Sequence, residues 1–136
     1  APDQRGRTYT PLGPALLTSE LNNKAYMAAA SSGGVTAAAA LVNVIARAGA
    51  GPQNLRDAMR APRTHYAGVP DKVFVEPDMP KYVIDELRKR GHDVALTKSI
   101  GRVTAVYCPT GVPNEKNISC LSAADPRGHG IALGGN

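Results

Sequence analysis

The chain has 136 residues, of which 43% are apolar, 4% are aromatic, 16 are Lys or Arg and 11 are Asp or Glu. A domain of this length buries about two thirds of the surface of its unfolded chain, so one folded unit over residues 1–136 is expected. The alanine-rich apolar stretch over residues 33–46 is shorter than the roughly 20 residues of a bilayer-spanning helix, so no membrane span is expected. The basic residues are scattered except for residues 88–90, which end a predicted helix, so nucleic acid is not an expected partner.

The first half of the sequence predicts two strands and then a long helix. Residues 14–18 and 24–30 have the composition of strands, and the turn-forming residues 19–23 favour a hairpin between them. Residues 35–48 show apolar side chains at helical spacing and are followed by a stop that contains Gly and Pro. The apolar residues that follow this spacing are Val35, Ala38, Leu41, Val42 and Ile45.

The second half predicts short strands and two more helices. A short helix is expected over residues 54–60, because Pro62 prevents its continuation, and a longer one over residues 80–90, because Gly91 ends it. The expected strands are residues 72–76, 92–97, 102–108 and 117–123, with a loop at 109–116. The fold class is therefore α/β in the sense of α+β, with mostly antiparallel strands.

The segment Ser31-Ser32-Gly33-Gly34 separates the second predicted strand from the long helix. Glycine allows positive φ and a close approach of the backbone to a ligand. The first amides of a helix have no intrahelical partner and lie at the positive end of the helix dipole. These residues predict a site for an anion or an oxyanion, while simple helix capping is the alternative interpretation.

Other reactive side chains form no recognised pattern. His65, His92 and His129 are far apart in the sequence and match no metal-ligand spacing, so no metal site and no cofactor are expected. Cys108 and Cys120 lie in neighbouring predicted strands and can face one another across a hairpin. Two buried free thiols are nevertheless the favoured interpretation.

Arg63 and Arg127 each follow a proline, in Ala61-Pro62-Arg63 and Asp125-Pro126-Arg127. Proline keeps the residue before it extended, and the planar guanidinium suits carboxylates and backbone carbonyls. Both arginines are predicted to be structural residues, with substrate binding as the alternative.

Several segments, taken in order, resemble the C-terminal part of the small subunit of gamma-glutamyltransferases (gamma-glutamyltranspeptidases). These segments are residues 31–34, 61–65, 69–76, 87–94 and 124–127, and the resemblance extends from about Thr10 to Arg127. It implies an N-terminal-nucleophile hydrolase with a four-layer αββα core, made as a precursor that cleaves itself. It also implies a companion chain whose N-terminal Thr attacks a small-molecule amide, such as a gamma-glutamyl amide, and passes the acyl group to water or an amine.

The resemblance assigns roles to particular residues. Gly33 and Gly34 correspond to the paired glycines whose amides form the oxyanion hole of the family. The family's Ser-Ser pair, which holds the substrate carboxylate, falls on Thr10 and Pro11, and Pro11 has no donor. The predicted substrate-binding residues are Thr10, Ser31 and Ser32. The change to Pro11 indicates a divergent member, such as an amidase or acylase with another acyl group.

Two functions remain open at this stage. The first is a component of an autoprocessed amide hydrolase or acyltransferase, and the second is a non-catalytic scaffold or interaction subunit of the same fold. The sequence begins at Ala1 with no initiator Met and no apolar signal core, which indicates a processed or excised chain. The resemblance also implies a periplasmic or extracellular location.

Overall fold

The computed structural model describes residues 10–11, 13–51, 54–113 and 120–133. Its largest element is an antiparallel sheet with the strand order β1-β2-β6-β7. The four strands are β1 (Ala15–Ser19), β2 (Lys24–Ser32), β6 (Arg102–Val112) and β7 (Leu121–Ala123). The predicted hairpin is confirmed, and Asn23 in its turn has a φ of 54°, which asparagine tolerates.

Strand β6 continues through residues 109–112, which the sequence predicted as part of a loop, so that prediction is wrong for these residues. The register against β2 shifts here, and the pairs on either side of the shift are Met27 with Tyr107 and Ala25 with Val112. Such a bulge releases the hydrogen-bond ladder locally, which accommodates Pro109, a residue with no amide to donate. Residues 114–119, where the predicted loop meets the last predicted strand, lie outside the described residues.

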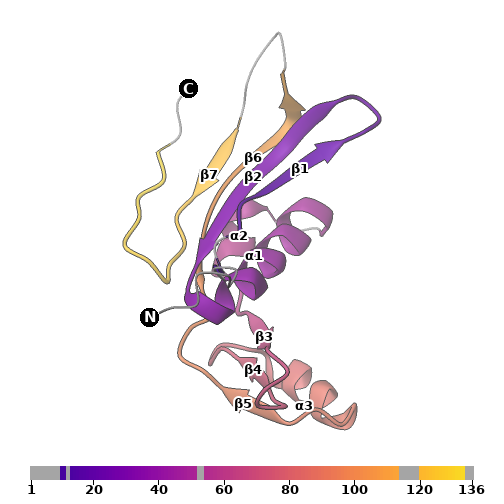
Figure 1. Cartoon of the computed structure of the whole chain (residues 1–136), viewed down its shortest axis with the longest axis vertical. Coiled ribbons are helices and arrows are strands. Elements are labelled where there is room, and N and C mark those ends of the chain that lie inside the picture. The colour runs from indigo at the N-terminus through magenta and orange to yellow at the C-terminus, as the bar shows by residue number, and fades with distance from the viewer. Residues whose placement is uncertain (1–9, 12, 52–53, 114–119, 134–136) are drawn as a thin grey trace, which may run out of the picture.

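The long helix consists of a 3₁₀ turn η1 (Gly34–Thr36), α1 (Ala37–Ile45) and a π-helical turn η2 (Ala46–Ala50). Helix α1 and the short helix α2 (Leu55–Arg60) lie against the same face of the four-stranded sheet (Figure 1). The core between them is formed by apolar residues of α1, α2 and the strands, among them Met27, Ala29, Ala40, Leu41, Val44, Leu55, Met59, Val103 and Ala105.

The buried residues of α1 agree only in part with the apolar face that the sequence spacing predicted. The buried residues are Ala37, Ala40, Leu41 and Val44, whereas Val35 and Val42 are 70% and 64% exposed. A helix that is apolar on nearly every side gives no sequence signal for which side is covered. Small alanines on the buried side allow α1 to lie close to the sheet.

A smaller sheet in the order β3-β4-β5 lies below the helices in the view of Figure 1, and Asn43 of α1 is hydrogen-bonded to the backbone of Thr64 in this sheet. It consists of β3 (Thr64–Tyr66), β4 (Val73–Val75) and β5 (Val94–Leu96), with α3 (Lys81–Lys89) connecting the parallel pair β4 and β5. The sequence did not predict β3, because three residues give too short a pattern to recognise. Its own apolar cluster contains Val73, Val75 and Met79, covered by side chains of α3.

Cys108 and Cys120 form a disulfide, so the preference for free thiols was wrong. The register explains the bond: Tyr107 pairs with Leu121, which places the two cysteines opposite one another at the next position of the ladder. The weaker alternative, two cysteines facing each other across a hairpin, is the one found.

Replacing both cysteines with serine is expected to lower the free energy of unfolding by about 3 kcal/mol, because the bond closes a loop of roughly a dozen residues in the unfolded chain. Urea unfolding with and without dithiothreitol measures this. The double serine variant should not respond to the reductant. A wild-type midpoint that is also insensitive to the reductant would contradict the disulfide.

None of the helices that the structure describes combines the length and the apolar character required to cross a membrane.

Candidate functional site

The Gly33–Gly34 step lies where β2 ends and the 3₁₀ turn η1 begins. Both glycines are exposed, and their φ angles are 130° and 60°. The side chain of Thr36 donates to the carbonyl of Gly33 over 2.9 Å, which fixes the direction of that peptide group. The step therefore presents backbone that is open to solvent in a conformation that favours glycine.

Positions 33 and 34 require glycine for different reasons. A Cβ on Gly33 would lie 2.7 Å from the Cα of Gly101, so no side chain fits there unless the backbone moves. A Cβ on Gly34 would have no atom within 4 Å. Gly33 is therefore held against the start of β6, whereas Gly34 requires glycine only for its positive φ.

Arg63 holds the segment that carries Gly101. Its guanidinium is fully buried and donates to the carbonyls of Ile100 and Gly101 over 3.0 and 3.3 Å. The same guanidinium forms an ion pair with Asp125 at 2.7 Å. The backbone beneath the Gly33–Gly34 step is thus attached to a buried charge.

Glu76 is the second centre of this buried network. Its carboxylate accepts the amide of Ile100 at 2.7 Å and the amide of Arg63 at 2.8 Å. Arg127 donates to it from Nε at 2.6 Å and also from Nη2. The carboxylate therefore joins the end of β4 to the segment before β6 and to the segment after β7.

Asp125 and Arg127 complete the network, which we call the arginine–carboxylate cluster: Arg63, Glu76, Asp125 and Arg127. Asp125 accepts the amide of Val103 at 2.7 Å. Arg127 donates to the carbonyls of Met59 and Ala61 at the end of α2, over 2.8 and 3.0 Å. The cluster thereby ties both sheets and α2 together directly behind the glycine step.

Both carboxyl groups of the cluster ionise more readily than free ones. Burial alone would raise the pKa of Glu76, but hydrogen bonds from the Arg127 side chain and from two backbone amides hold it below its ordinary value. Burial also opposes ionisation of Asp125, yet the Arg127 amide and the Arg63 side chain lower its pKa. Both groups are therefore charged at neutral pH.

This direction of the pKa shifts predicts a loss of stability in acid. A carboxyl whose pKa is lower in the folded state contributes stability that is complete above the unfolded pKa, about 4, and is lost as the pH falls through the folded pKa. Urea unfolding between pH 7 and pH 3 should show this fall, and Glu76→Gln should make it shallower. Glu86→Gln, in an exposed pair with Arg90, should leave the slope unchanged; an equal effect of both variants would contradict the prediction.

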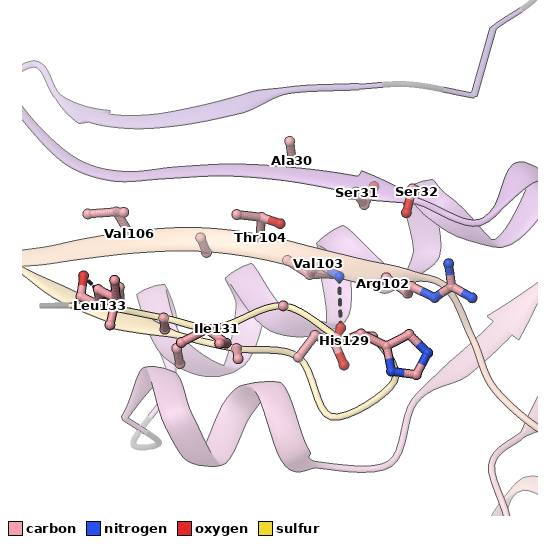
Figure 2. Close-up of a pocket in the computed structure, with 18 residues that line it drawn as sticks. Ala30, Ser31, Ser32, Arg102, Val103, Thr104, Val106, His129, Ile131 and Leu133 are labelled. Atoms are coloured by element: carbon pink, nitrogen blue, oxygen red, sulfur yellow. Dashed lines mark hydrogen bonds between the residues drawn. The ribbon is translucent and has the colours of Figure 1, made fainter.

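The three predicted substrate-binding residues, Ser31, Ser32 and Thr10, lie in different surroundings. Ser31 is buried and donates its hydroxyl proton to the carbonyl of Ala37 over 2.7 Å, so it can only accept from a ligand. Ser32 is exposed, and both serines line a pocket of about 550 Å³ between β2, β6, β7 and residues 128–133 (Figure 2). Thr10 does not line this pocket.

His65 and Glu76 are both buried, and neither was predicted to be a site residue. His65 is buried beside Phe74, with ring centroids 6.4 Å apart. In the part of the chain that the structure describes, no three His, Cys, Asp or Glu residues gather as a metal site would require. The sequence analysis did not single out Glu76, although an acidic residue directly after a buried strand was a signal that could have been followed.

Comparisons with known proteins show the family and the fold of the chain. The sequence matches the family model described as Gamma-glutamyltranspeptidase over residues 1–135. A mutant of Helicobacter pylori gamma-glutamyltranspeptidase superposes with a TM-score of 0.81 at 27% identity, covering 93% of this chain and 66% of that one. An acivicin-inhibited gamma-glutamyltranspeptidase, in which the C-terminus has critical roles in autoprocessing and catalysis, gives 0.81 at 26%, covering 93% and 65%.

A third structure shows the same fold at lower identity. The Bacillus anthracis transpeptidase CapD has a TM-score of 0.74 at 20% identity, covering 96% of this chain and 75% of that one. A search of curated proteins by sequence found no match.

The mixed α/β fold, with mostly antiparallel strands, is that of the structural neighbours, which are N-terminal-nucleophile hydrolases. The chain belongs to the gamma-glutamyltranspeptidase family, a family of autoprocessed hydrolases and transferases. It spans about two thirds of the length of the first two relatives described above, at 66% and 65%.

Proposed function

We propose that the chain is the C-terminal part of the small subunit of an autoprocessed amide hydrolase or acyltransferase. The candidate acyl group is gamma-glutamyl, and the proposed nucleophile is an N-terminal Thr on a companion chain of the same precursor. The observation that carries this proposal is the exposed Gly33–Gly34 step at the end of β2.

In this reaction, attack on the amide carbonyl forms a tetrahedral intermediate whose oxygen is negative. The amides of Gly33 and Gly34 are the proposed donors to that oxygen, and no proton has to move to stabilise it. One donor of this kind typically contributes about 10² to 10³ in rate. Residues 33 and 34 of this chain therefore contribute directly to catalysis in the proposed reaction.

This chain also has an exposed apolar sheet face that a companion chain would cover. Alternating residues of β1, β2 and β6 face away from α1, and among them Leu16 and Val106 are 63% and 42% exposed. A shallow apolar pocket of about 510 Å³ lies over these strands. A second sheet packed on this face would bury it and would complete the four layers that the resemblance implies.

The roles proposed for individual residues follow from their contacts. Ser32 is the stronger candidate for substrate binding, because the proton of the Ser31 hydroxyl is already used by Ala37. The proposed role of Thr10 in substrate binding requires that the companion chain place the substrate beside it. Arg63 and Arg127 are proposed as structural supports of the site, because their guanidinium groups are held within the cluster.

Intact-mass analysis of the assembled protein, combined with an assay on gamma-glutamyl p-nitroanilide, tests the proposal. We expect a companion chain that begins with Thr and carries the mass of the acyl group after rapid quenching. Pro11, at a position where the resemblance expects a serine donor, favours the alternative of a non-catalytic scaffold subunit. A companion chain that never becomes acylated, with any of a panel of acyl anilides, would support that alternative.

A further inference from the structure

Thr36 lies in the turn η1 and is hydrogen-bonded twice to the carbonyl of Gly33. Its backbone amide donates over 3.3 Å, just beyond the usual range, and its hydroxyl donates over 2.9 Å, within that range. The side chain therefore supplies the better of the two bonds. Together the bonds turn the Gly33 carbonyl toward the helix that follows.

The direction of this carbonyl fixes the direction of the Gly34 amide. The two groups belong to one peptide, which is planar and trans, so its C=O and N–H bonds point in opposite directions. Because the carbonyl points into the turn, the amide of Gly34 points out of it. Within the described residues that amide has no acceptor, so it is available to an oxyanion.

Ordinary helix capping does not account for the hydroxyl of Thr36. The residue directly precedes α1, at the N-cap position, where a threonine hydroxyl usually accepts an amide of the first helical turn. Among the residues that the structure describes, it forms no such bond with α1. The hydroxyl instead points back to Gly33.

The peptide between the two glycines needs such a restraint. Glycine has the widest conformational freedom, and both residues have positive φ. Gly33 is packed against Gly101, but a Cβ on Gly34 would have no atom within 4 Å, so packing does not restrain that side of the peptide. Threonine is suited to this task, because its branched Cβ restricts χ1 and keeps the hydroxyl in place.

We propose that Thr36 is a positioning residue of the oxyanion hole, whose hydroxyl holds the Gly33–Gly34 peptide with the Gly34 amide directed at the reacting carbonyl. This inference rests on the proposed function, since it assigns Thr36 to the reaction proposed there. Thr36 acts through Gly34, so loss of its hydroxyl destabilises the transition state and leaves substrate binding unchanged.

Thr36→Val tests the inference, because valine keeps the branched shape and removes the hydroxyl. In the assembled protein we expect the burst rate of p-nitroaniline release from gamma-glutamyl p-nitroanilide to fall about five- to tenfold, the scale of one neutral hydrogen bond. The substrate concentration at half-maximal rate should stay unchanged. Thr36→Ser, which keeps the hydroxyl, should restore most of the rate. Thr97→Val, at a half-buried threonine directly after β5, should not alter it.

A second measurement separates positioning from a merely structural role. A boronate analogue of the acyl substrate mimics the tetrahedral intermediate, whereas glutamate, the released acyl product, does not. We expect Thr36→Val to weaken inhibition by the boronate by the same factor as the burst rate. Inhibition by glutamate should not change.

Three results would overturn the inference. They are a Thr36→Val burst rate equal to that of the wild type, a Thr36→Ser variant as slow as Thr36→Val, and equal losses of boronate and glutamate inhibition. Thr36→Ala provides the same comparison if valine prevents assembly with the companion chain. Failure of the proposed function is distinguishable, because the wild-type assembly would then release no p-nitroaniline.

Discussion

Gly34→Val should lower kcat of the assembled enzyme by about 10²-fold, the cost of losing one oxyanion donor. A β-branched residue does not adopt the φ of 60° at this position, so the peptide must rotate and its amide turns away from the oxyanion. A Cβ at position 34 would have no atom within 4 Å, so the expected loss comes from the backbone conformation and not from a clash of the Cβ. Stopped-flow or steady-state turnover of an acyl anilide measures it.

Gly91→Val is the matched control for Gly34→Val. Gly91 is also exposed, has a φ of 89° and would place its Cβ in open space, but it lies at the end of α3, away from the site. Both variants should lose a similar free energy of unfolding, about 1–2 kcal/mol. Equal kcat values for the two variants would remove Gly34 from the oxyanion site.

Arg63→Met should cost about 3–5 kcal/mol of unfolding free energy, the largest stability effect that we expect in this chain. The guanidinium is fully buried, so its removal deprives Asp125 of an ion-pair partner and leaves the carbonyls of Ile100 and Gly101 without their donor. Activity should fall as well, because Gly101 supports Gly33. Urea unfolding of the assembled protein gives the free energy.

Arg90→Met is the matched control for Arg63→Met, because Arg90 pairs with Glu86 on the exposed surface of α3. Its cost should stay below about 1 kcal/mol. The double variant Arg63→Met/Asp125→Asn should be less destabilised than the sum of its single changes, since it removes both members of the buried Arg63–Asp125 ion pair. Strict additivity would mean that the two side chains do not depend on one another.

The predictions that succeeded rest on local signals. The hairpin and the helices are encoded by turn residues and by apolar spacing within short stretches of the sequence. The resemblance added the family, which the comparison over residues 1–135 establishes.

The predictions that failed depend on contacts between distant segments. The disulfide requires the register of β6 and β7, and the extension of β6 requires a bulge against β2. The buried hydrogen bonds that hold the segment before β6 could not be predicted either. Glu76 bonds Ile100 and Arg127 across sequence separations of 24 and 51 residues. No pattern within a window of one helix or strand contains that information.

A crystal structure of the assembled protein with a boronate analogue of the acyl substrate, bound covalently to the nucleophile, tests the oxyanion assignment most directly. A boronate mimics the tetrahedral intermediate, and one of its oxygens takes the place of the carbonyl oxygen. We expect that oxygen at about 2.7–3.1 Å from the backbone nitrogens of both Gly33 and Gly34. A boronate oxygen held by other donors, with both glycine amides out of hydrogen-bond range, would contradict the account.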